Sequence, residues 1–385
     1  MSTRPHGPGL TRHFHRIAWL AVALAFGVIV FGAFVRLSHA GLSCPDWPTC
    51  YGRVTWPKAA ADAADHAASA IRPFDGRRAW REQVHRHLAA ALGVLVLVLA
   101  LIGARKRRFG MAWVLAAAGI VGLAIPLYMQ GQHVIASVLA LVGEAILLAA
   151  AWRWSNEDLA RISALTLALI VFQALLGMWT VTWLLKPVVV MGHLLGGLGS
   201  FGLLTWMAWR ATDAPLRAVD ERSLRAWLRI GLGVLLAQIA LGGWVSANYA
   251  AMACGIDFPK CLGQWWPSHD VGEALVLWRG IGVDYEGGVL DAPARIAIQL
   301  MHRLFACAVL AYMAALVIRL LRVPGMRGWG VLLGLATLAQ LSLGIANVML
   351  GLPLEVAVLH NAGAVLLLFV VVTLLARLAP LGRSG

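Results

Sequence analysis

The sequence predicts an all-α polytopic membrane protein that is built from two parallel four-helix-bundle repeats plus an inserted helical hairpin. Three observations predict this fold: the apolar composition, ten apolar spans and an internal duplication. Of 385 residues, 60% are hydrophobic and 13% are charged, whereas an ordinary soluble domain has about 25% charged residues. A mean hydropathy of +0.77 and repeated apolar runs exclude a soluble α/β enzyme, a disordered chain and a secreted disulfide scaffold.

Each apolar run is long enough to form a transmembrane helix. The expected spans are 17–36, 84–104, 110–129, 134–152, 162–184, 187–209, 225–247, 294–318, 328–350 and 354–377. Basic residues concentrate in alternate short loops, so both termini are expected in the cytoplasm and the long loops 37–83 and 248–293 outside. The net charge of +14 is therefore interpreted as orienting the chain in a membrane, and no nucleic-acid partner is expected. The N-terminus lacks a signal-peptide cleavage site, so the first span should stay as an anchor, most simply in a bacterial inner membrane.

The duplication is visible as motifs that recur in the same order. Val35 and Cys44 precede Val245 and Cys254 by one common interval, and His85-Arg86 recurs as His302-Arg303. The set Gln173, Gly177 and His193 recurs as Gln340, Gly344 and His360. The interval is shorter for the last set because the first half contains an extra hairpin at 110–152. An even number of spans in each repeat predicts parallel repeats, related by an axis along the membrane normal.

These boundaries define the expected domains. They are an N-terminal cytoplasmic tail (1–16), an N-terminal repeat (17–209) that includes the hairpin, a cytoplasmic linker (210–224), a C-terminal repeat (225–377) and a cytoplasmic tail (378–385).

Four histidines occupy equivalent positions near the outer ends of spans: His85, His193, His302 and His360. Two imidazoles on different helices of a bundle are a typical pair of axial ligands for haem iron. A single intramembrane histidine is more often a hydrogen-bond partner between helices, but the duplication favours haem ligation. A Zn or Cu site is disfavoured because the helices offer few further ligands.

The two repeats differ beside the first histidine of each pair. Glu82 lies three residues before His85, on the same helix face, whereas Gln299 holds the equivalent place before His302. A carboxylate in one site alone predicts proton chemistry there and electron transfer in the other. The alternative is a surface glutamate. Arg86 and Arg303 follow the two histidines and either pair with haem propionates or extend to lipid headgroups.

Two cysteine pairs lie in the long outer loops, Cys44 with Cys50 and Cys254 with Cys261. An oxidising periplasm would allow each pair to form a small-loop disulfide. Such a bond either staples a loop over the site or takes part in thiol exchange and electron transfer.

Taken together, several motifs resemble the heme A synthase family over most of the chain, except the hairpin 110–152. They are Val35-Arg36-Leu37-Ser38, Gly41-Leu42-Ser43-Cys44-Pro45-Asp46-Trp47-Pro48, Glu82-x-x-His85-Arg86, the run Gln173 to Thr182, His193-Leu194-Leu195, His302-Arg303 and His360-Asn361. The extra hairpin departs from the usual eight-span pattern of that family.

The resemblance implies a membrane oxidoreductase that acts on a CH3 group. It would oxidise a porphyrin methyl of heme O to the formyl group of heme A by successive hydroxylations, for terminal oxidase assembly. By resemblance, His302 and His360 ligate a cofactor haem b, His85 and His193 ligate the iron of the substrate haem, and Glu82 is the catalytic acid or base. The resemblance also matches Cys44 with Cys50 and Cys254 with Cys261 as the paired loop cysteines.

Three other functions are weighed against this one. A non-catalytic di-haem b electron carrier would want haems at both membrane faces, whereas all four histidines lie towards the outer face. A membrane thiol-disulfide oxidoreductase would leave the duplicated histidines unexplained. A transporter would show broken helices and midplane polar sites.

The expected partners are heme O, membrane lipid, terminal oxidase assembly factors and heme O synthase. Of these, heme O synthase could dock on the hairpin 110–152. A homo-oligomer is compatible with the sequence.

Overall fold

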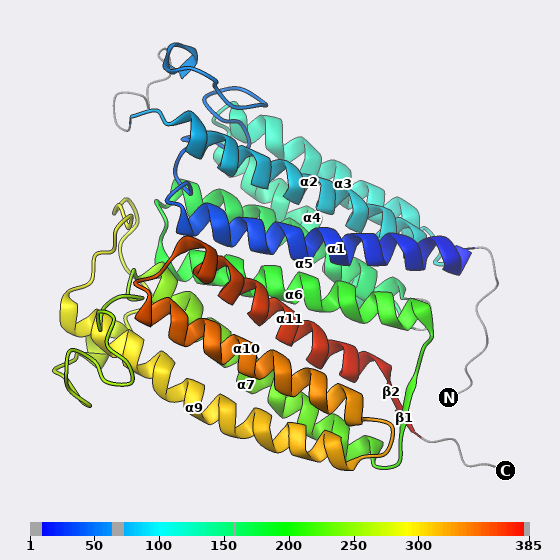
Figure 1. The fold of residues 1–385 in the computed structure, drawn as a ribbon. Coiled ribbons are helices and arrows are strands. Elements are labelled where there is room, and N and C mark those ends of the chain that lie inside the picture. Colours follow the sequence, from blue (N-terminus) through cyan, green and yellow to red (C-terminus); the bar gives the residue numbers. More distant parts are fainter. Residues whose placement is uncertain (1–9, 64–72, 157–158, 381–385) are drawn as a thin grey trace. The chain divides into compact units, whose positions relative to one another are not determined.

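The computed structural model describes residues 10–63, 73–156 and 159–380, so residues 1–9 and 381–385 of the two expected tails lie outside it. Within these ranges, ten helices are long and apolar enough to cross a membrane. They are α1 (Leu10–Leu37), α2 (Gly76–Ala104), α3 (Gly110–Met129), α4 (His133–Arg153), α5 (Ala160–Thr182), α6 (Pro187–Thr212), α7 (Glu221–Ala247), α9 (Ala292–Arg322), α10 (Arg327–Met349) and α11 (Leu354–Arg377) (Figure 1). All ten expected spans are confirmed, and the protein is a multi-pass membrane protein.

Helix α2 begins well before the apolar window that predicted it. It begins at Gly76, where the Asp75 side chain caps it by accepting hydrogen bonds from the backbone N–H groups of Arg77 and Arg78. Asx caps of this kind satisfy N–H groups that have no partner inside the helix. The polar first two turns of α2 therefore extend out of the predicted span and carry Glu82 and Gln83, and Arg86 follows in the third turn.

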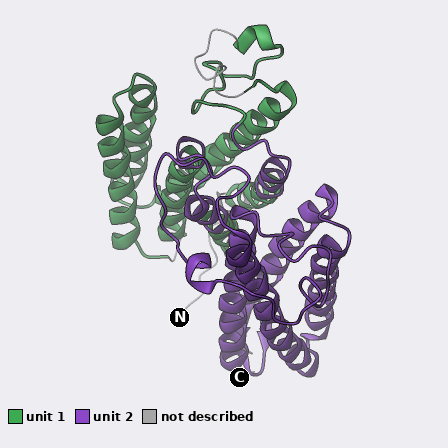
Figure 2. Cartoon of the chain, turned by 90° about the vertical axis from the view of Figure 1, so that its left-hand side faces the viewer, with its two compact units in different colours: residues 1–28, 43–178, 196–213 green, residues 29–42, 179–195, 214–385 purple. Residues whose placement is uncertain are grey.

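The chain forms two compact units, which Figure 2 shows in green and purple. Unit 1 consists of residues 1–28, 43–178 and 196–213, and unit 2 of residues 29–42, 179–195 and 214–385. In unit 2, α7 contacts α9, α9 contacts α10, α10 contacts α11 and α11 contacts α7. These contacts close a four-helix bundle, as the sequence predicts for the C-terminal repeat.

Unit 1 contains the inserted hairpin, in which α3 packs along α4 and also contacts α2. Close approach in the hairpin depends on Gly143, because a Cβ there would lie 2.5 Å from the Val121 side chain. Helix α2 meets α5 where Gly103 faces Ser163, and α6 meets α1 where Trp19 donates to the Thr212 hydroxyl at 3.1 Å.

Four short elements were not predicted. The outer loops contain a 3-10 turn, η1 (Ala60–Ala63), and a one-turn helix, α8 (Val271–Ala274). Strand β1 (Leu216–Ala218) pairs in parallel with β2 (Leu378–Pro380), which joins the linker before α7 to the segment after α11. Strands of three residues leave no periodic pattern in a sequence, so they could not be predicted from it.

Candidate functional site

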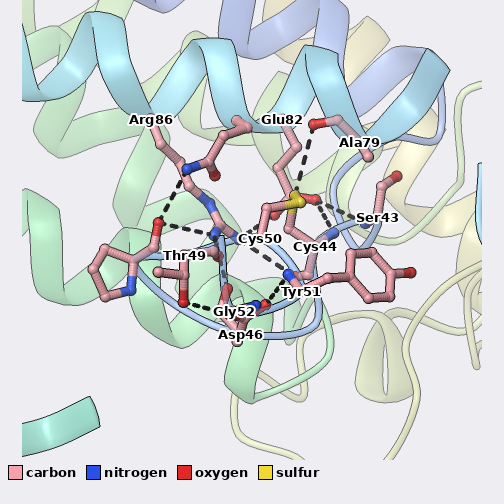
Figure 3. The surroundings of a disulfide bond; sticks show 12 residues. Ser43, Cys44, Asp46, Thr49, Cys50, Tyr51, Gly52, Ala79, Glu82 and Arg86 are labelled. Atoms are coloured by element: carbon pink, nitrogen blue, oxygen red, sulfur yellow. Dashed lines mark hydrogen bonds and ion pairs between the residues drawn. A yellow bond between two sulfur atoms is a disulfide. The ribbon is translucent and has the colours of Figure 1, made fainter. Parts of the chain in front are cut away.

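The outer loop of unit 1 is fastened to the first turns of α2. A disulfide joins Cys44 to Cys50. The buried carboxylate of Glu82 accepts hydrogen bonds through Oε2 from the backbone N–H of Ser43 at 2.7 Å and of Cys44 at 2.8 Å (Figure 3). Further along the loop, the carbonyl of Val54 accepts a hydrogen bond of 2.6 Å from the side chain of Gln83, the residue after Glu82. The alternative of a surface glutamate is therefore excluded.

Arg86 completes this attachment. Its Nη1 donates to the carbonyls of Asp46 at 2.7 Å and Thr49 at 2.6 Å, and its Nη2 donates to Glu82 Oε1 at 2.5 Å. Both ends of the guanidinium are thus engaged by the loop and by the carboxylate one helical turn away. A guanidinium satisfied in this way has little donor capacity left for a ligand.

Inside the loop, Asp46 organises the turn that the disulfide closes. Its carboxylate accepts from the backbone N–H of Tyr51 at 2.6 Å and of Gly52 at 2.8 Å, and also from the Thr49 hydroxyl. Gly52 has φ of 71°, a left-handed conformation that glycine adopts without strain. Each of these contacts lies within the loop, so the loop is preorganised before anything binds.

Unit 2 repeats this architecture. A disulfide joins Cys254 to Cys261. Asp257 accepts from the backbone N–H of Gly263 at 2.6 Å, and Arg303 Nη1 donates to the carbonyl of Lys260 at 2.9 Å, as Arg86 does to Thr49. The internal duplication therefore includes the outer loops as well as the helices.

The two loops differ at the carboxylate. Gln299 is buried in the place of Glu82, and its Oε1 finds no hydrogen-bond partner among the described residues. The Nε and Nη2 atoms of Arg303 are likewise buried without a hydrogen-bond partner in the part of the chain that the structure describes. Arg303 therefore has unpaired charged donors, whereas Arg86 donates from its Nη2 to Glu82.

Below the second loop, the C-terminal bundle carries two imidazoles. His302 on α9 lies beside the Gln238 amide of α7, with Nε2 of Gln238 3.2 Å from Nδ1 of His302. His360 on α11 lies beside Gln340 of α10, whose Nε2 donates to the His360 carbonyl at 3.0 Å.

Glycines give each imidazole its room. A Cβ at Gly242 would lie 3.2 Å from Cε1 of His302, and a Cβ at Gly344 would lie 3.1 Å from Cε1 of His360. Both distances are tighter than ordinary carbon contacts. Gly344 was predicted only as a repeat marker, without a role, and Gln238 was not predicted because glutamines on apolar spans carry no distinctive spacing.

The C-terminal residues fit a haem b. Two axial imidazoles suffice for a haem iron, and Nδ1 of His360 is buried with no hydrogen-bond partner among the described residues. Arg303 adds unsatisfied charged donors, which suit a propionate. Within those residues no group of three or more His, Cys, Asp and Glu side chains gathers to hold a metal ion, whereas Zn sites of protein ligands need three or four.

The other two histidines fall in different units: His85 lies on α2 in unit 1, and His193 lies on α6 in unit 2. Their pairing stays a prediction. The local packing next to each second histidine is duplicated, however. The Gln173 amide lies against Gly196, where a Cβ would overlap Nε2, and the Gln340 amide lies against Gly363, where a Cβ would overlap Oε1.

The sequence analysis also missed Lys186, which directly precedes α6. Its side chain is fully buried, and its Nζ has no hydrogen-bond partner among the described residues. Loss of hydration lowers the pKa of this ammonium below its usual range. The signal that could have found it is a lysine in the short turn between two outer span ends.

Comparison with known proteins agrees with this architecture. A family model described as cytochrome oxidase assembly protein matches residues 15–133 and 131–372, and so includes the inserted hairpin. A heme A synthase of Shewanella oneidensis is 35% identical over 93% of this chain and 96% of its own length. A heme A synthase of Caulobacter vibrioides is 28% identical over 91% of this chain and 92% of its own, and one of Paracoccus denitrificans is 30% identical over 46% and 45%. The chain belongs to the heme A synthase family of cytochrome oxidase assembly proteins.

Proposed function

We propose that this chain makes heme A for cytochrome oxidase assembly, by oxidising a porphyrin methyl of heme O to a formyl group through successive hydroxylations. The observation that carries the proposal is the match to heme A synthases over nearly the whole chain. The difference between the two repeats, Glu82 in one and Gln299 in the other, supports the proposal. A heme A synthase of this kind would bind one haem as its substrate and a second haem only as an electron carrier.

The proposed cofactor is a haem b in the C-terminal bundle, with His302 and His360 as axial ligands and Arg303 at a propionate. A bis-imidazole haem supplies one-electron transfer. The protein's contribution is to position the two histidines: Gln238 lies against a ring nitrogen of His302, and Gln340 donates to the backbone carbonyl of His360.

The proposed substrate ligands are His85 and His193. Glu82 stays the candidate acid or base, but three donors already engage its carboxylate. Proton transfer by Glu82 would therefore require at least one of these contacts to open. The same contacts hold the disulfide loop against α2, so Glu82 also positions the loop. Arg86 as a propionate contact stays a prediction, since its Nη atoms have partners of their own.

We place the protein in a bacterial inner membrane, with both termini in the cytoplasm and the two disulfide loops in the periplasm. The support is the charge distribution of the short loops and the two disulfides, which persist in an oxidising compartment. Heme O synthase is the proposed partner of the hairpin α3–α4. Deleting residues 110–152 should abolish its co-purification and leave the haem b content intact.

The activity is tested by extracting haem from the purified protein, expressed with and without a source of heme O, and separating the products by chromatography. We expect haem b alone without the source, and heme A or its hydroxylated intermediate with it. Haem b alone in both preparations would favour the electron carrier, and no haem in either would favour the thiol oxidoreductase.

Ligand roles are tested in the same assay. His302→Ala should remove haem b, whereas His85→Ala should keep haem b and lose formyl formation. His87→Ala is the matched control, because His87 is exposed on α2 two residues from His85. If this control variant also lost formyl formation, the effect of His85→Ala would reflect damage to α2 and not loss of a ligand.

A further inference from the structure

The turn between α5 and α6 buries a positive charge that lacks a counter-ion. Lys186 is 0% exposed, and its ammonium lies 3.3 Å from the ring centroid of Trp278 and 5.4 Å from that of Trp183. Aromatic faces attract cations, but they replace only part of the lost hydration. Nothing in the described part of the chain supplies Lys186 with a carboxylate or a hydrogen-bond acceptor.

The position adds to the cost. Lys186 directly precedes α6, a helix of 26 residues, and its carbonyl accepts from the N–H of Val189 and Val190. The N-terminus of a helix carries a partial positive charge and favours anions over cations. A lysine and a helix N-terminus at one point therefore form a preorganised anion site, and both would be stabilised by a single carboxylate.

The outer loop of the second repeat covers this place. The Tyr285 N–H donates to the Leu184 carbonyl at 3.1 Å, and the buried Tyr285 hydroxyl donates to Gly280 at 2.7 Å. The nearby Glu273 is engaged by Arg279 at 2.7 Å. The loop thus brings Trp278 over the ammonium, and no carboxylate of the described residues pairs with Lys186.

The repeats indicate what the anion belongs to. In the C-terminal repeat the place of Lys186 is taken by Pro353, and Arg303 has spare charged donors. In the N-terminal repeat the equivalent Arg86 is committed to Glu82 and the loop. Lys186 therefore stands in the repeat whose arginine is occupied. It precedes His193 by seven residues, which is two helical turns or roughly 10 Å of rise on nearly the same helix face.

We propose that Lys186 binds a propionate carboxylate of the substrate haem whose iron His193 ligates. This rests on the proposed function, because it takes His193 to be a ligand of the exchangeable haem. The carboxylate would accept a charge-assisted hydrogen bond from the ammonium and lie at the N-terminus of α6. Release of the oxidised haem would leave the ammonium unpaired again. A single ion pair of this kind can hold the haem during the reaction and still let the product leave.

The test is haem binding to the full-length protein in detergent, with its haem b retained, using ferric protohaem and its dimethyl ester as probes. The Soret change reports uptake of a second bis-imidazole haem. Lys186→Met should weaken binding of protohaem about 10- to 100-fold, the value of a hydrogen bond to a charged group, and leave binding of the ester unchanged. Lys186→Arg should retain most of the affinity, and Lys58→Met, at an exposed loop lysine, should have no effect.

The outcomes separate this inference from the proposed function. Equal weakening of the acid and the ester, or no weakening of either, would overturn the role of Lys186 while uptake of a second haem persisted. No second haem in the wild-type protein, or uptake that survives His193→Ala, would overturn the proposed substrate site and this inference with it. An intact haem b spectrum shows that each variant has folded.

Discussion

The Glu82 carboxylate and the Arg86 guanidinium form an ion pair of 2.5 Å across one turn of α2. Both are buried, and each also bonds the backbone of the disulfide loop. Because buried charges are costly unless they are paired and hydrogen-bonded, the pair and the loop depend on each other. The equivalent pair in the second repeat, Gln299 and Arg303, has no such bond, so the two outer loops are fastened with different strengths.

Replacing Glu82 with glutamine should loosen the first loop. The amide removes the negative charge and cannot accept all three hydrogen bonds, each of which contributes about 1.5–3 kcal/mol when a charged group is involved. We expect a thiol reductant to open Cys44–Cys50 faster in Glu82→Gln than in the wild type, as measured by alkylation and mass spectrometry. The matched control, Gln299→Ala, should leave Cys254–Cys261 unchanged, because Gln299 Oε1 holds nothing among the described residues.

The same variant separates the two roles of Glu82. A carboxylate that only positions the loop predicts that Glu82→Gln changes the affinity for heme O and the rate of disulfide opening together. A catalytic acid or base predicts that formyl formation is lost even when the variant is saturated with heme O, whatever the rate of disulfide opening.

The reciprocal change should disturb the haem b site. In Gln299→Glu a new carboxylate would lie one turn before Arg303 and would capture its free Nε and Nη2 donors, as Glu82 captures Arg86. We expect the purified variant to hold less haem b per protein, as measured by the pyridine haemochrome assay. Gln299→Leu is the control for volume. A haem content equal to that of the wild type in Gln299→Glu would show that Arg303 does not bind a propionate.

The glycines beside the imidazoles give a third prediction. Gly344→Ala would place a methyl group 3.1 Å from Cε1 of His360, so the imidazole or α10 must shift; overpacking of this kind costs about 1–3 kcal/mol. We expect a lower haem b content and an altered low-spin spectrum. Gly233→Ala is the control on α7, because nothing lies within 4 Å of its added methyl. Alanine there should stabilise the helix by roughly 0.5–1 kcal/mol.

Most of the fold could be predicted because membrane helices are specified locally. Apolar length fixed the ten spans, and the repeated histidines and cysteines identified the two homologous halves. What the sequence could not show depends on contacts between distant residues. The hydrogen bonds of Arg86 to the carbonyls of Asp46 and Thr49 arise only when the loop folds back on α2. The burial of Lys186 likewise depends on a loop nearly 100 residues further along the chain.

The pH dependence of stability offers a last test of Lys186. Burial lowers the pKa of its ammonium in the folded protein, so between that value and the unfolded value the unfolded chain binds more protons. Stability of the substrate-free wild type should therefore rise with pH in that interval. Lys186→Met, which removes the charge, should melt at a higher temperature than the wild type at pH 7, and this difference should shrink as pH is raised towards the unfolded pKa. The comparison of the two proteins cancels titration of all other groups. A variant that melts below the wild type at every pH would mean that the Trp183–Trp278 contacts stabilise the ammonium enough to make it a structural residue.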